Sequence, residues 1–184
     1  MDTKSGELES LIDFTPYQPK TDWAWVPGIQ WSAEGLVLFT VINNMENGEQ
    51  SADSYDLTAI LLDSKRVVPL VSRCGLFCYP IPSNPADTED YLVGFLSAIL
   101  PDQSETSRYA LNIMDRDGSN RKKLYPSEGL QGLDPQLISW SPVEDAEMGQ
   151  WLAFTAKGNM MLIEIPSGTI KQITGDGSIS KIVW

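Results

Sequence analysis

The chain has 184 residues, a formal net charge of -12 and 42 % hydrophobic residues. Such a composition is that of a globular domain, and its acidity disfavours nucleic acid and anionic membranes as partners. The sequence contains no His, so its own residues cannot form a Ser-His-Asp triad, a Cys-His pair or a His-ligated zinc site.

The first 28 residues predict one strand and one candidate binding surface. SGELESL, residues 5–11, matches SGTIKQI, residues 167–173, in its turn and its two apolar positions, which predicts a strand. TDWAWVPG then places Trp23 and Trp25 two residues apart. We expect these two side chains to pack on a neighbouring unit; the functional alternative is an aromatic platform for a peptide or a sugar.

The next segment, up to residue 73, predicts four strands. Trp31 opens WSAEG, a turn that precedes the apolar run LVLFTV. The acidic segment 43–56 is expected to be a long loop, and YDLTAILLDSKRVVPL, residues 55–70, predicts a hairpin by its polar turn.

A second unit follows from residue 74. Its CGLFC segment holds Cys74 and Cys78, which in an extended chain lie too far apart for an easy disulfide; we expect two small buried side chains. Tyr79 stands where the first unit has its Trp. A further acidic loop, 83–91, precedes the apolar run 91–100, which is too short to span a bilayer and predicts a buried strand.

The second hairpin repeats the first one 54 residues later. YALNIMDRDGSNRKKL, residues 109–124, aligns Tyr109 with Tyr55 and Leu124 with Leu70. Its DRDGSN segment does not match the ligand spacing of an EF-hand and is expected to be a hairpin turn. The basic run 121–123 is expected to be a solvated face.

The third unit repeats the Trp-Ser phrase in DPQLISWSP, where Trp140 precedes the strand GQWLAF and the hairpin NMMLIEIPSGTIKQI. Trp31, Tyr79, Trp140 and Trp184 recur at steps of 48, 61 and 44 residues. A four-stranded propeller blade takes about 40–45 residues before insertions.

DPQLISWSP, GQWLAF and IMDRDGSNRKKL together resemble the TolB-type, WD-like propeller repeat. The resemblance implies an all-β fold, a partial β-propeller of four-stranded antiparallel blades with about three to four blades present. We place the blades near residues 28–73, 74–128 and 129–175. Residues 1–27 would hold the last strand of a preceding blade and a linker, and 176–184 the first strand of a following one.

The resemblance implies a non-catalytic module for protein-protein interaction or scaffolding. It also implies a bacterial source, and a periplasmic or extracellular location if the protein is like TolB. We expect a protein partner, self-association through open blade edges, no nucleic-acid partner and no membrane insertion. No residue is assigned to catalysis, a cofactor or a metal. The alternative is the accessory, gating propeller of a larger hydrolase such as a prolyl-oligopeptidase-type serine peptidase, and a third possibility is a propeller glycosidase with its carboxylates on other blades.

Overall fold

The computed structural model describes residues 6, 8, 10–12, 28–46, 49–84, 90–142, 150–165 and 167–183, with the backbone alone for 44–46 and 49–54. Its strands form three antiparallel sheets of four strands each, in which strands that follow one another along the chain are neighbours. Sheet 1 consists of β1 (Ile29–Trp31), β2 (Val37–Glu46), β3 (Glu49–Leu61) and β4 (Arg66–Val71). Sheet 2 consists of β5 (Ile81–Pro82), β6 (Leu92–Ala98), β7 (Tyr109–Asp115) and β8 (Lys122–Tyr125). Sheet 3 consists of β9 (Ser139–Trp140), β10 (Gln150–Ala156), β11 (Asn159–Ile165) and β12 (Ile170–Gln172).

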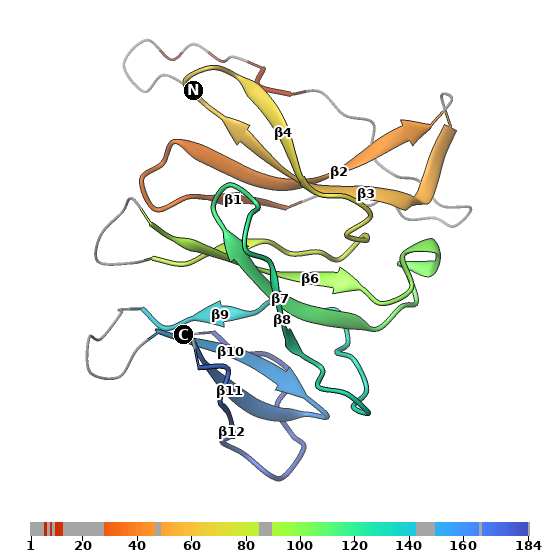
Figure 1. Ribbon diagram of the computed structural model, residues 1–184, viewed down its shortest axis with the longest axis vertical. Helices are drawn as coiled ribbons and strands as arrows, with labels where there is room; N and C mark the ends of the chain where they lie inside the picture. The colour runs from red at the N-terminus through yellow and green to blue at the C-terminus, as the bar shows by residue number, and fades with distance from the viewer. Residues whose placement is uncertain are drawn as a thin grey trace.

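The three sheets lie one above another, with sheet 2 between the other two (Figure 1). One short 3-10 helix, η1 (Pro101–Gln103), is the only helical element in the part of the chain that the structure describes. This architecture confirms the predicted all-β class and the four-stranded antiparallel blades of a partial propeller, each sheet being one blade. Among the described residues there is no helix with the length and apolar character needed to cross a membrane.

Sheet 2 is buried on both faces because it packs against both neighbours. Val93 and Phe95 of β6 belong to the core shared with sheet 1, whereas Leu96 and Ala98 belong to the core shared with sheet 3. A strand that is covered on both sides reads as a continuous apolar run instead of an alternating one. This arrangement confirms the buried strand predicted within residues 91–100.

The 54-residue repeat corresponds to equivalent positions in sheets 1 and 2. The side chains of Tyr55 and Tyr109 are both fully buried. Each lies where the chain returns from the fourth strand of its sheet: the Tyr55 carbonyl accepts from Cys74 N at 2.7 Å, and the Tyr109 carbonyl accepts from Leu133 N at 2.8 Å. The repeated Tyr therefore marks where the connection to the next blade leaves its own sheet.

One buried Ser closes the turn between the first two strands of every sheet. In each case the Ser N–H donates to the carbonyl of a residue at the start of the second strand, and the Ser Oγ accepts from the N–H of that same residue. The three pairs are Ser32 with Val37 (2.9 and 3.0 Å), Ser83 with Leu92 (2.7 and 3.1 Å) and Ser141 with Trp151 (2.8 and 3.1 Å).

These Ser turns correct the alignment of Tyr79 with the two Trp residues. Trp31 pairs with Leu38 and Trp140 with Leu152, and the residue in this position of sheet 2 is Pro82, paired with Val93. The repeated phrase in the second unit is therefore Pro82-Ser83. The alignment with Tyr79 was wrong because it followed the aromatic side chain and not the hydroxyl that the turn requires.

Trp31 and Trp140 occupy the same register but different surroundings. Trp140 is 7 % exposed; its indole N–H donates to the Ile81 carbonyl at 2.8 Å, and its ring lies against Gly94 of sheet 2. Trp31 is 56 % exposed, because no preceding sheet lies against sheet 1 in the described residues. Trp31 therefore lacks the contact between two sheets that buries Trp140.

The DRDGSN segment forms the expected hairpin turn between β7 and β8. The Asp117 carboxylate accepts from the Ser119 N–H at 2.9 Å and from its hydroxyl at 2.6 Å. These two bonds lower the pKa of Asp117. Gly118 has φ +86, a conformation that Gly adopts without steric cost.

The acidic segment 43–56 is a hairpin and not the predicted loop. β2 and β3 continue their pairing from Asn43–Tyr55 to Glu46–Glu49, with a register shift between Asn43 and Met45, and form an arm in Figure 1. The prediction failed because backbone hydrogen bonds hold a strand pair even where its sequence lacks an apolar alternation.

The two chain ends are described only in part. Of residues 5–11, predicted as the last strand of a preceding blade, the structure describes 6, 8, 10 and 11, and none of these four lies in a strand. Residues 173–183 form no strand; their backbone follows the β10–β11 turn, where Ile179 N donates to the Gly158 carbonyl at 2.8 Å. The assignment of the chain ends to further blades stays a prediction.

Cys74 and Cys78 form a disulfide, which corrects the expectation of two separate thiols. Their Cα atoms are 5.8 Å apart, because the segment is a turn and not an extended strand. Gly75 and Tyr79 both have positive φ, +99 and +44, and bend the chain on either side. Both cysteines are fully buried, as predicted.

We predict that Trp140→Ala lowers the free energy of unfolding by about 3–5 kcal/mol, because it empties a buried contact between two sheets. The matched variant Trp31→Ala removes the same side chain from an exposed position and should cost about 0.5 kcal/mol or less. Urea unfolding monitored by circular dichroism measures both. Equal losses for the two variants would contradict the assigned contact.

We also predict that the Cys74–Cys78 bond is present in the purified chain. Under denaturing, non-reducing conditions iodoacetamide should add no mass, and after reduction it should add two labels. Because the bond closes a short loop, the double variant Cys74→Ser/Cys78→Ser should lose about 2 kcal/mol of stability. Labelling of both thiols before reduction would show that the bond is not formed.

Candidate ligand site between sheets 2 and 3

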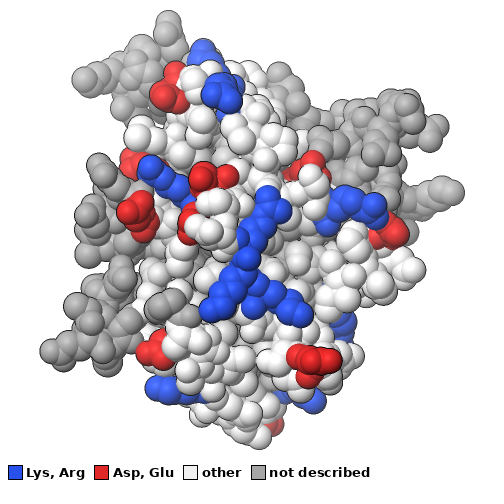
Figure 2. All heavy atoms as spheres, viewed as in Figure 1, with Lys and Arg blue, Asp and Glu red and all other residues white. Residues whose placement is uncertain are grey.

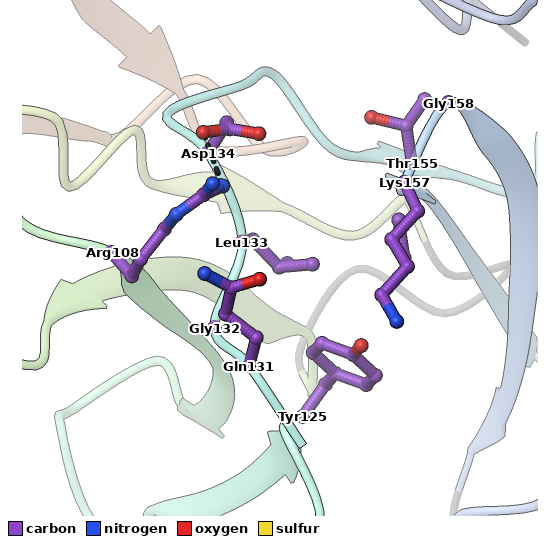
Figure 3. Close-up of a pocket in the computed structure, with 10 residues that line it drawn as sticks. Arg108, Tyr125, Gln131, Gly132, Leu133, Asp134, Thr155, Lys157 and Gly158 are labelled. Atoms are coloured by element: carbon purple, nitrogen blue, oxygen red, sulfur yellow. Dashed lines mark ion pairs between the residues drawn. The ribbon is translucent and has the colours of Figure 1, made fainter. Parts of the chain in front are cut away.

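A cavity of about 120 Å³ lies where sheets 2 and 3 meet (Figure 3). Three parts of the chain enclose it: the ends of β7 and β8, the segment 131–134 that leads to sheet 3, and the β10–β11 turn. The side chains that matter for its chemistry are Arg108, Tyr125, Gln131, Asp134 and Lys157.

The wall formed by residues 131–134 lies flat against sheet 2. Leu133 and Tyr109 exchange two backbone hydrogen bonds, of 2.8 and 2.9 Å. A Cβ at Gly132 would overlap the Ile99 side chain and lie 2.9 Å from the Tyr109 carbonyl oxygen. Only Gly permits this close approach, which fixes the backbone of the adjacent Gln131.

The opposite wall is the two-residue turn Lys157–Gly158 between β10 and β11. Both residues have positive φ, +52 and +71, as a type I′ hairpin turn requires. Gly177 packs against this turn from outside the hairpin. A Cβ at Gly158 would overlap the Gly177 carbonyl group.

The side chain of Gln136 fixes the end of β10 beside this turn. Its Oε1 accepts from the Thr155 N–H at 2.6 Å and from the Thr155 hydroxyl at 2.8 Å, and its Nε2 donates to the Thr155 carbonyl at 2.8 Å. Gln136 thus pairs with β10 as a neighbouring strand would. The site is therefore built on restrained backbone on both sides.

Some polar groups of the cavity have partners within the protein and others do not. Arg108 forms an ion pair with Asp134, drawn as a dashed line in Figure 3. Tyr125 is 7 % exposed and its ring contacts that of Phe154, 5.2 Å between centroids. Within the described residues its hydroxyl has no hydrogen-bond partner, and the Lys157 ammonium has no ion-pair partner. This arrangement can bind a small polar group, and it lacks a nucleophile paired with a base.

A second hollow, of about 410 Å³, lies between sheets 1 and 2 and is mostly apolar. Tyr91 and Glu34 border it; the Tyr91 hydroxyl and Glu34 Oε2 are buried without a hydrogen-bond partner among the described residues. Burial, followed by the charge of Glu34, raises the pKa of Tyr91 to about 12.

The sequence-predicted candidate residues Trp23 and Trp25 lie outside the described residues, so their role stays a prediction. The basic run is exposed as expected at Arg121, Lys122 and Lys123, and Lys and Arg side chains lie across the middle of the face in Figure 2. The Arg121 guanidinium also donates to the carbonyls of Gly118 and Leu70, and so joins sheet 2 to sheet 1.

No family model matches the chain. Among solved structures it is similar to TolB from Acinetobacter baumannii, with a TM-score of 0.54 and 12 % sequence identity over 85 % of this chain and 34 % of that one. This likeness confirms the predicted fold: the chain is a partial TolB-like β-propeller.

Among curated proteins the chain is 37 % identical over 188 residues to the probable dipeptidyl-aminopeptidase B of two strains of Coccidioides posadasii, C735 and RMSCC 757 / Silveira. The alignment covers 95 % of this chain and only 18 % of each relative. These relatives are named as enzymes, which contradicts the expectation that the protein is not an enzyme. They are also fungal, so they do not support the expected bacterial source.

We predict that Gly158→Ala destabilises the chain more than Gly129→Ala does. Both Gly residues have positive φ, but a Cβ at Gly129 meets nothing within 4 Å, whereas at Gly158 it overlaps Gly177. The first variant should lose about 1–3 kcal/mol more than the second, by overpacking. Thermal unfolding measures the difference, and equal losses would mean that Gly177 does not hold the turn.

Proposed function

We propose that this chain is part of the propeller of a dipeptidyl-aminopeptidase and acts beside a serine-hydrolase domain on the same longer polypeptide. The observation that carries the proposal is the 37 % identity, which extends over 95 % of the chain, to proteins named probable dipeptidyl-aminopeptidase B. The chain spans 18 % of their length, so the proposal assigns the catalytic groups to other parts of the protein.

The amino-acid composition supports this division of roles. A serine peptidase needs a nucleophile, a base and a group that orients the base, and the base is usually His. The chain contains no His. The propeller would then restrict access to the catalytic domain and bind parts of the substrate away from the scissile bond.

The exposed face of sheet 1 supports a larger propeller. Trp140 is buried by the preceding sheet, and Trp31, in the same register, is 56 % exposed. Closed propellers have about four to eight blades, more than the three sheets described. A further blade against sheet 1 would cover Trp31 as sheet 2 covers Trp140.

The test begins with the coding sequence beyond residue 184. We expect a Gly-x-Ser-x-Gly strand-to-helix turn there, and release of dipeptides by the extended polypeptide from a peptide with a free N-terminus. The acetylated peptide is the control substrate, and replacement of the motif Ser by Ala should lower the rate at least about 1000-fold. An extended polypeptide that holds only further blades, or that releases no dipeptide, would refute the proposal.

A further inference from the structure

We propose that the cavity between sheets 2 and 3 is a carboxylate-binding site formed by Lys157, Tyr125 and Gln131. It is independent of the proposed peptidase activity, since it depends only on groups of this chain. All three side chains line the same cavity and can donate hydrogen bonds.

The Tyr125 hydroxyl carries the inference furthest. The residue is 7 % exposed and its ring is fixed against Phe154, so its orientation is set by packing. The hydroxyl faces the cavity in Figure 3 and has no hydrogen-bond partner among the described residues. A hydroxyl that packing holds toward a cavity, without a partner in the described protein, is placed to donate to an acceptor that enters from solution.

The charge of the cavity favours a monoanion. Arg108 and Asp134 form an ion pair and balance each other, and Lys157 remains as a cation without an ion-pair partner in the described part of the chain. One carboxylate would neutralise Lys157, and its oxygens could accept from the ammonium, the Tyr125 hydroxyl and the Gln131 amide.

The size and stiffness of the cavity support a small planar group. A volume of about 120 Å³ holds only a few heavy atoms, well below the roughly 300 Å³ at which pockets for drug-sized ligands begin. Its walls are restrained by the Lys157–Gly158 turn, the Gln136–Thr155 bonds and the flat approach of Gly132. Little backbone ordering is then needed on binding, which favours affinity for a small ligand.

The test is a titration of the 184-residue chain with sodium acetate, followed by amide chemical shifts in NMR against sodium chloride at equal ionic strength. We expect saturable shifts near Gly132 and Gly158, with a Kd of about 1–10 mM. Lys157→Met and Tyr125→Phe should each raise the Kd at least about tenfold, since each removes one hydrogen bond to a charged group.

Lys65→Met is the matched control, because Lys65 is also a turn lysine with positive φ, +54 against +52 for Lys157, and lies away from the cavity. It should leave the Kd unchanged. Titrations with N-acetyl-diglycine and with its amide show whether the site takes a free small acid or the C-terminus of a peptide. Binding of acetate but not of N-acetyl-diglycine assigns a small acid. Binding of acetate and of N-acetyl-diglycine, without binding of the amide, assigns a peptide C-terminus as well.

Three results would overturn the proposal: no saturable shift up to about 100 mM acetate, an equal effect of Lys65→Met and Lys157→Met, or phosphate binding more tightly than acetate. Because Lys157 is exposed, its variant tests the site even if Tyr125→Phe alters the packing of the core.

Discussion

The contact between Trp140 and sheet 2 shows the constraint on which the rest of the structure depends. The indole ring covers Gly94 on β6 and its N–H donates to the Ile81 carbonyl, so one residue satisfies both the apolar and the polar requirements of the junction. A four-stranded sheet cannot bury both of its faces by itself, and each sheet here depends on its neighbours. The exposure of Trp31 follows from the same rule, since the described residues provide no sheet on that side.

The features that the sequence predicted correctly are those fixed by local chemistry. The hairpin of DRDGSN follows from Asp117 and Gly118, and the Tyr55 and Tyr109 repeat follows from equivalent places in two sheets. The features it missed depend on backbone conformation that residue type does not signal. The Cys74–Cys78 bond lies in a turn that is followed by a positive φ at Tyr79, which is uncommon for a residue with a bulky side chain.

The candidate site could not have been predicted because its residues share no local pattern. Tyr125 and Gln131 come from the end of sheet 2 and the segment after it, and Lys157 comes from a hairpin of sheet 3. Only the Lys157–Gly158 pair carries a readable signal, that of a two-residue hairpin turn. That signal predicts the turn and says nothing about Tyr125, which reaches the same cavity only through the packing of the two sheets.

The effect of a ligand at this junction depends on how its binding free energy compares with the free energy of packing between sheets 2 and 3. A ligand that touches both Tyr125 and Lys157 binds only while sheets 2 and 3 are packed together, so it stabilises that arrangement. At a concentration ten times its Kd the gain is about 1.4 kcal/mol, which is less than the roughly 3–5 kcal/mol lost when a buried Trp is truncated. The junction is therefore held by its core, and the cavity responds to a ligand without being needed for the fold. Such a site can bind and release a small acid while the propeller remains assembled.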